Sequence, residues 1–185
     1  ESLLCKIMKN CISGRITGRT ELSDSQIPET IEKMMNEWEN FGGRLNPGAL
    51  RRYCYSQKRI VSYEEWLNWI DEDKRAGQEL YFFINEQRIL GAISLRPKKD
   101  ANHIGTDGHI GYGIRPSERR KGYATIMLSM ALPILKRHGI NPVVISCDKD
   151  NTGSAKTILN NNGTLVEEIA DKASGNILQI YQIQL

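Results

Sequence analysis

The sequence predicts an α+β fold, in which a mixed, mostly antiparallel sheet has helices on both faces, so that three layers stack as α, β and α. Two observations predict this. Before residue 78, apolar residues recur with helical spacing in two segments, and after it they gather in short runs interrupted by two further helical segments. The predicted order after the leading helices is two strands, a strand, a helix, a strand, a helix and two strands. Such an order is typical of a sheet covered by helices.

The first predicted helix runs from Pro28 to about Asn40. A proline suits the first turn of a helix, because its missing N–H has no partner there. Apolar residues at positions i, i+3, i+4 and i+7 form one buried stripe: Ile31, Met34, Met35 and Trp38. Turn-forming residues over 41–48 then predict a loop.

The second predicted helix begins after Ser62 and runs to about Ala76. Ser62 and Glu65 have the spacing of a capping box, and Gly77 suits the helix end. The apolar stripe consists of Tyr63, Trp66, Leu67 and Ile70.

Short apolar runs bounded by turn residues predict the strands. These runs lie at 80–84, 89–95, 109–115, 143–147, 165–169 and 177–183, and a weaker alternation covers Ile16 to Leu22. The third helix, from about Gly122 to His138, buries Ala124, Met127, Leu128, Ala131 and Leu135 and contains Pro133, which removes one helix hydrogen bond. A fourth, shorter helix is expected over 151–162.

Composition excludes several classes of protein. The net charge of +3, from 25 basic and 22 acidic residues, is too small to indicate nucleic-acid binding. Four scattered cysteines and three histidines have no metal-site spacing, so no metal is expected. No apolar run approaches the roughly 18 residues of a membrane span, and no signal peptide is evident, so a reduced, cytoplasmic protein is expected.

A basic turn lies between the strand that ends near Ile114 and the helix that begins near Gly122. Helix N-termini present unpaired N–H groups and partial positive charge, and a glycine lets an anion approach them closely. Four cations fall within seven positions beside this element: Arg115, Arg119, Arg120 and Lys121. The turn therefore predicts a pyrophosphate site, although it matches neither the Walker A nor the dinucleotide glycine motif.

This segment resembles the coenzyme A motif of the GNAT acetyltransferases, in which Arg or Gln is followed three residues later by Gly and five residues later by Gly or Ala. Here the motif is Arg119-Arg120-Lys121-Gly122-Tyr123-Ala124. The preceding Ile114-Arg115-Pro116 and the later Asn151-Thr152-Gly153-Ser154 are also similar to that family. The strand His109-Ile110-Gly111-Tyr112 resembles a bacterial branch of predicted acetyltransferases.

The resemblance implies the acyl-CoA N-acyltransferase fold, acetyl-CoA as co-substrate, no metal, and direct transfer of acetyl to an amine. It implies a single domain over 1–185, with an unexplained segment at 1–24, an acceptor-side helical region at 25–77 and an acetyl-CoA-binding core at 79–185. The implied cofactor-binding residues are Ile114, Arg115, Arg119, Arg120, Lys121, Gly122, Tyr123, Ala124, Thr125, Asn151 and Ser154. Asn151 is equally typical of a helix N-cap.

The resemblance also suggests catalytic residues. His109 occupies a strand position where relatives carry a base, and its alternative role is that of a hydrogen-bonded strand histidine. A tyrosine often protonates the leaving thiolate in this family, but the matching position here is Ile158. Ser154 is then the candidate acid, or a helix-capping residue, and Cys147 is a strand cysteine that faces the acetyl group or the core.

The partner expected from this reasoning is a small-molecule or peptide amine, with neither nucleic acid nor membrane, and with a homodimer as one of the assembly states open to the family. The sequence leaves the identity of the amine open. Two other functions compete with this one: a coenzyme A-binding sensor without activity, suggested by Ile158, and a polyanion-binding module that uses the basic turn.

Overall fold

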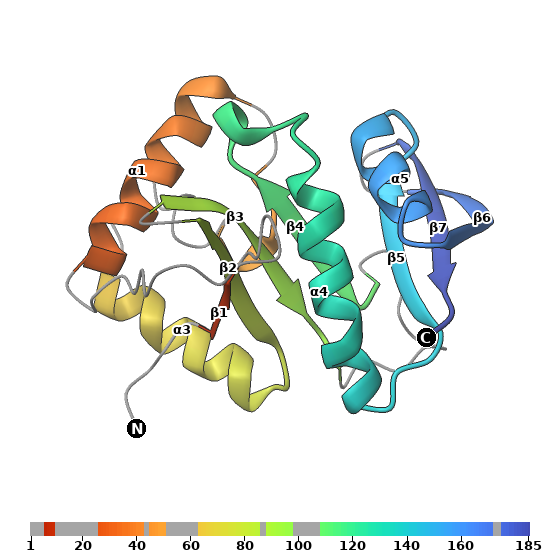
Figure 1. The fold of residues 1–185 in the computed structure, drawn as a ribbon, viewed down its shortest axis with the longest axis horizontal. Helices are drawn as coiled ribbons and strands as arrows, with labels where there is room; N and C mark the ends of the chain where they lie inside the picture. The colour runs from red at the N-terminus through yellow and green to blue at the C-terminus, as the bar shows by residue number, and fades with distance from the viewer. Residues whose placement is uncertain are drawn as a thin grey trace. The chain divides into compact units, whose positions relative to one another are not determined.

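The computed structural model describes residues 6–9, 26–42, 45–50, 63–85, 88–97, 108–171 and 175–185. Figure 1 shows the elements in chain order. They are β1 (Lys6–Lys9), α1 (Gln26–Phe41), α3 (Tyr63–Arg75), β2 (Glu79–Asn85), β3 (Arg88–Leu95), β4 (Ile110–Ile114), the 3₁₀ turn η2 (Pro116–Glu118), α4 (Tyr123–Arg137), β5 (Val143–Asp148), α5 (Thr152–Leu159), β6 (Gly163–Ala170) and β7 (Ile177–Ile183). The chain forms two compact units, which comprise residues 1–94 with 112–123, and residues 95–111 with 124–185.

The first unit contains α1, α3 and most of a four-stranded sheet in the order β1-β2-β3-β4. β1 pairs with β2 in parallel, with Lys6 opposite Tyr81. The strands β2 and β3 are buried along almost their whole length, which explains why their sequences are continuous apolar runs rather than alternating ones.

The predicted apolar stripe of α1 is confirmed as the centre of this unit's core. Ile31, Met34, Met35 and Trp38 are each at most 3% exposed, and they pack with Trp66 of α3 and with side chains of β2 and β3. The indole Nε1 of Trp66 donates to the carbonyl of Ala49 (3.2 Å), so its polar atom is satisfied within the core.

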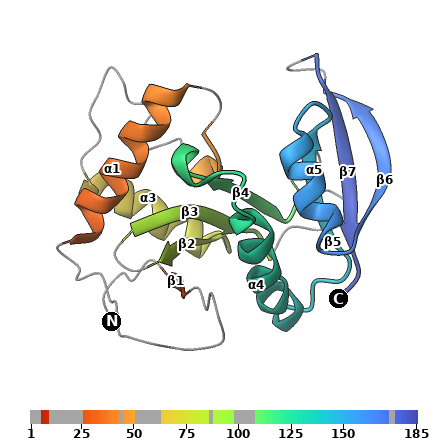
Figure 2. The same ribbon diagram turned by 45° about the horizontal axis from the view of Figure 1, so that its top comes forward.

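The second unit contains a three-stranded antiparallel sheet in the order β5-β7-β6. β7 is the central strand, with Cys147 of β5 and Glu168 of β6 both opposite its Gln179. Figure 2 shows α5 lying beside this sheet, as it also does in Figure 1. The buried Ile158 anchors α5 there.

The predicted fold class is confirmed, since the chain is α+β with antiparallel sheets flanked by helices. The predicted elements over 28–40, 80–84, 89–95, 109–115 and 143–183 differ from the observed ones mainly at their ends. Pro133 does lie inside α4. Helical residues at 48–50 begin within the predicted loop at 41–48, which sequence reasoning did not predict.

Two predictions, the strand over Ile16–Leu22 and the Ser62 cap, lie outside the described residues. The division of the chain into functional regions stays a prediction. Within the described residues, no helix has both the length and the apolar character needed to cross a bilayer.

Candidate functional site

The predicted phosphate-binding turn is an open, irregular segment between β4 and α4. After the 3₁₀ turn η2, the chain passes through left-handed backbone conformations at Arg120 (φ 64°) and Gly122 (φ 81°), and α4 then begins at Tyr123. Arg120, Lys121 and Gly122 are exposed. Left-handed residues at alternate positions turn neighbouring backbone N–H groups toward a common point, and such turns form concave anion-binding sites.

Backbone donors of this turn remain available. Within the described part of the chain, the N–H groups of Gly122 and Tyr123 donate to no other group. Apart from its chain neighbours, no described atom lies within 4 Å of where a Cβ on Gly122 would stand. The residues present therefore fit a diphosphate group, because open space adjoins unpaired donors at a helix N-terminus.

The guanidinium of Arg115 is hydrogen-bonded to other residues of the first unit. Its Nε donates to Oε2 of Glu37 (2.8 Å), a second nitrogen reaches the same oxygen, and Nη1 donates to the carbonyl of Ile89 (3.1 Å). The side chain is 7% exposed. Arg115 thus holds β4 against α1 and β3, and its role in binding the cofactor stays a prediction.

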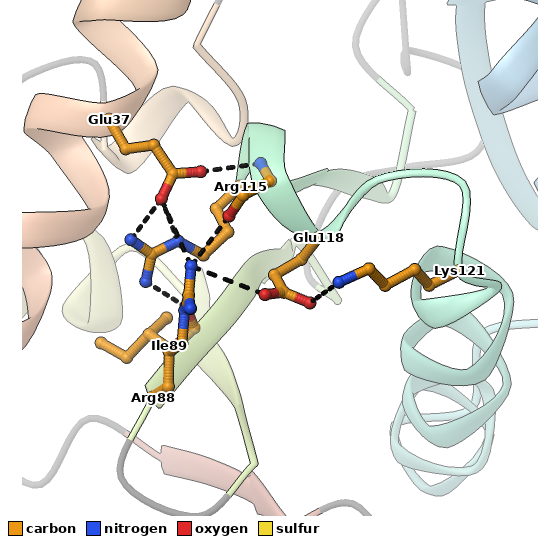
Figure 3. A network of polar contacts seen from close by, with 7 residues as sticks. Glu37, Arg88, Ile89, Arg115, Glu118 and Lys121 are labelled. Carbon is orange, nitrogen blue, oxygen red and sulfur yellow. Dashed lines mark hydrogen bonds and ion pairs between the residues drawn. The ribbon is translucent and has the colours of Figure 1, made fainter.

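Around this pair, Figure 3 shows a network of alternating charges. The backbone N–H of Ser117 donates to Oε1 of Glu37 (2.7 Å), and Arg88 donates to the Ser117 hydroxyl (2.8 Å). Arg88 also lies 3.6 Å from Glu37 and 3.5 Å from Glu118, whose other oxygen accepts a hydrogen bond from Lys121 (2.9 Å). The network joins α1, the β2–β3 hairpin and the turn.

Arg119 is held by aromatic rings of α1. Its guanidinium carbon lies 5.4 Å from the ring centroid of Trp38 and 4.8 Å from that of Phe41, and its Nε donates to the carbonyl of Ile114 (3.1 Å). Cation–π contacts of this kind position a guanidinium without neutralising it. Among the described residues, Arg119 and Arg120 form no ion pair. Burial lowers the pKa of Arg119, and the nearby charge of the Glu37 carboxylate partly offsets that effect.

The Glu37 carboxyl is strongly acidic because of these donors. Partial burial raises its pKa, but the hydrogen bonds from Arg115 and from Ser117 outweigh burial and lower the pKa from 4.5 to about 2. Glu37 is therefore ionised at every physiological pH, and the network keeps its charge.

We expect Glu37→Gln to lower the free energy of unfolding by about 2 kcal/mol at pH 7, less than the full pKa shift implies because solvent screens a side chain that is one quarter exposed. A depressed pKa stabilises the fold above the unfolded value near 4.5, and this contribution disappears as the pH falls toward 2. Urea unfolding of both proteins from pH 7 to pH 3 should show the difference shrinking below about pH 4.5. A constant difference would contradict the pKa assignment.

His109 lies within the second unit and is 1% exposed. Its backbone N–H donates to the carbonyl of Val144 (2.7 Å), and its Nδ1 accepts from the Val144 N–H (2.9 Å). A neutral imidazole whose Nδ1 accepts a hydrogen bond carries its proton on Nε2, so it has no spare lone pair for an incoming proton. The role of His109 as a base stays a prediction, and this geometry favours the hydrogen-bonded strand histidine.

The structure brings Asn151 and Ser154 together at the start of α5. Asn151 is the N-cap, and its Oδ1 accepts from the Ser154 N–H (3.0 Å). The Ser154 side chain hydrogen-bonds the Cys147 thiol, which lies at the end of β5. Burial raises the pKa of Cys147 and outweighs that hydrogen bond, which lowers it, so Cys147 stays a protonated thiol at neutral pH.

Ile158 is fully buried and packs against Gly163, where an added Cβ would stand 2.4 Å from its side chain. It is a core residue without any group that donates a proton. Thr125 offers its backbone carbonyl to the amide nitrogen of Asn161 (3.2 Å), which ties the first turn of α4 to the end of α5 within the second unit. Among the described residues, no cluster of three His, Cys, Asp or Glu side chains could hold a metal.

Sequence reasoning missed Glu37, Arg88 and Glu118. One signal was present for Glu37: it follows the buried Met34 by three positions, at the margin of the α1 stripe, where a carboxylate needs a partner. The spacing of Arg88 offered no signal, since its partners are distant in the sequence. For Glu118 a local signal was present, because its partner Lys121 lies three positions later.

Comparison with known proteins identifies similar chains. The family model described as an acetyltransferase (GNAT) domain matches residues 25–163. No curated protein matches the sequence significantly.

Several solved structures share the fold. A ribosomal-protein-alanine N-acetyltransferase from Brucella melitensis superimposes with a TM-score of 0.61 at 12% identity, over 89% of this chain and 97% of that one. RimL, a ribosomal-protein alpha-N-acetyltransferase in complex with coenzyme A, gives a TM-score of 0.61 at 17% identity, over 89% and 91%. The structure of yncA from Salmonella typhimurium with acetyl-CoA gives 0.55 at 16%, over 69% and 76%.

Proposed function

Because the chain belongs to the family of GNAT acetyltransferases, we propose that it transfers the acetyl group of acetyl-CoA directly to a primary amine of a small molecule or peptide. The observation that carries this proposal is the open turn at the N-terminus of α4. There, as far as the described residues go, the N–H groups of Gly122 and Tyr123 have no acceptor, Arg119 and Arg120 have no ion-pair partner, and the space beside Gly122 is open. A diphosphate supplies the acceptors and the negative charge that such a turn lacks.

The residues of the turn have different proposed roles. The N–H groups of Gly122 and Tyr123 bind phosphate oxygens, as does the charge of Arg120, while Lys121 is shared with Glu118. Arg119 faces the anion from its place beside Trp38 and Phe41. Ala124 and Thr125 continue the first turn of α4, where the helix dipole adds attraction. Ile114 offers backbone groups to the pantetheine arm, although its carbonyl already accepts from Arg119.

Acetyl transfer from a thioester needs few further groups from the protein. A thioester is already activated, so positioning a neutral amine against its carbonyl carbon supplies much of the rate. As the new C–N bond forms and the C–S bond breaks, the leaving thiolate needs a hydrogen bond or a proton. We propose that the Ser154 hydroxyl donates a hydrogen bond to the leaving thiolate, and that the thiolate takes up the proton that the attacking nitrogen loses, so that amide and free thiol are the products. Asn151, which fixes the start of α5, keeps Ser154 in place.

The acceptor is proposed as an amine because the superimposed structures include enzymes that acetylate ribosomal proteins. Peptide N-termini, polyamines and other small amines fit this chemistry. Calorimetry with acetyl-CoA, followed by thiol release with a panel of such amines, tests the proposal. We expect micromolar binding and thiol release with at least one amine class. If acetyl-CoA does not bind at millimolar concentration, the proposal is wrong.

One observation favours a second candidate function, a coenzyme A-binding sensor. The residue at the position where relatives carry a tyrosine acid is Ile158, which is buried and cannot donate a proton. A sensor would bind acetyl-CoA as tightly as an enzyme but release thiol no faster than buffer with every amine. The panel therefore separates the two functions.

A further inference from the structure

We propose that Glu37 of α1 is a positioning residue for the coenzyme A site, which it controls by holding the turn between β4 and α4 in its open shape. The inference rests on the proposed function and adds to it a residue of α1, a helix that is distant from the motif in the sequence. Glu37 and the turn are separated by about 80 positions in the sequence, but they lie in one compact unit, with Arg115 and Ser117 as the link.

The Glu37 carboxylate accepts hydrogen bonds from two points of the turn. One oxygen binds the Arg115 guanidinium just after β4, and the other binds the N–H of Ser117 inside the 3₁₀ turn. Figure 3 shows the Arg115 guanidinium beside the Glu37 carboxylate. A carboxylate held by donors on both sides of Pro116 fixes the direction in which the chain leaves the strand.

Glu37 also balances the positive charges around the turn. Glu37 and Glu118 together pair with Arg88, Arg115 and Lys121. Without Glu37, the buried Arg115 would have no carboxylate partner and would need to move toward solvent or toward the bound diphosphate. Glu37 therefore keeps Arg115 in a structural role, and Arg119 and Arg120 remain to bind the ligand.

Helix α1 also contacts the turn at positions next to Glu37. Trp38, the residue after Glu37, packs against the Arg119 guanidinium, and Phe41 one turn later does the same. Gly113 of β4 packs so closely against Trp38 that a Cβ there would stand 2.7 Å from the indole ring. The C-terminal end of α1 therefore packs against the segment between β4 and α4, and Glu37 makes the charged contact between them.

Glu37→Gln keeps the size of the side chain but removes its charge. We expect coenzyme A to bind about tenfold more weakly by calorimetry, measured at a temperature where circular dichroism shows the variant folded. S-acetylpantetheine, which lacks the diphosphate, should bind within twofold of the wild-type affinity by ligand-observed NMR. A general structural defect would weaken both ligands alike, so the difference between them reports positioning.

The matched control is Glu29→Gln on the same helix, where the carboxylate pairs with Lys33 (2.7 Å) but both side chains are about two-thirds exposed. It should leave both affinities unchanged. If Glu37→Gln does not fold, Arg115→Lys provides the test, because a lysine keeps the charge but cannot bind the carboxylate as a fork. It should weaken coenzyme A severalfold and spare S-acetylpantetheine.

Two outcomes would overturn the inference: unchanged coenzyme A affinity in Glu37→Gln, or equal loss for both ligands. Failure of the wild-type protein to bind coenzyme A would instead overturn the proposed function. The two failures are therefore distinguished by the wild-type titration alone.

Discussion

Gly122→Val is expected to weaken coenzyme A binding by at least 100-fold. A side chain at this position points into space that no described residue fills, beside the N–H groups of Gly122 and Tyr123, where the diphosphate is proposed to lie. The branched side chain displaces the anion and also disfavours the left-handed backbone (φ 81°) that presents those groups. Calorimetric titration with coenzyme A measures the effect.

Backbone strain and blocked access need to be separated in this experiment. Gly139, after the end of α4, has nearly the same backbone angle (φ 77°), and again no described atom beyond its chain neighbours lies within 4 Å of a Cβ built there. Gly139→Val should therefore cost the same 1–2 kcal/mol of stability, roughly, as Gly122→Val. Gly139→Val should leave the coenzyme A affinity within about twofold of the wild-type value. If both variants bind as the wild type does, the diphosphate binds elsewhere.

The fold was predictable because local patterns and burial agree in this chain. The stripe Ile31, Met34, Met35 and Trp38 is apolar at helical spacing and is buried as one face. The runs that became β2 and β3 contain few polar residues because the strands are covered on both sides. Helix ends were less predictable, since α5 ends at Leu159 rather than near residue 162, where the chain instead turns through a left-handed Asn162.

The site was only partly predictable, because a basic sequence does not reveal which cations are already paired. Arg115 and Arg119 looked alike in the motif. The structure separates them, since Arg115 is neutralised by Glu37 and Arg119 rests on aromatic rings without an ion pair among the described residues. The deciding partner comes from α1, and no local spacing rule connects residues 78 positions apart. Long-range charge pairing is a property of the fold, not of the motif.

His109→Ala is expected to destabilise the protein by about 3 kcal/mol. The substitution leaves the buried Val144 N–H without an acceptor and opens a cavity beside β5. Gly108 leaves little room for compensation, because a Cβ there would stand 2.7 Å from the Val144 carbonyl. Chemical unfolding of the variant and the wild type measures the loss.

His109→Asn separates the two roles considered for this residue. The amide oxygen of asparagine can take the place of Nδ1 and accept from Val144, but an amide does not take up a proton at neutral pH. Since Nδ1 is occupied in the structure, we expect the asparagine variant to recover most of the stability that alanine loses and to release thiol at nearly the wild-type rate with whichever amine proves active. A stable variant with turnover reduced 10²-fold or more would show instead that the imidazole exchanges its bond to Val144 during the reaction and acts as the base. The stability measurement makes either result interpretable, because it shows first whether the hydrogen bond to β5 has been restored.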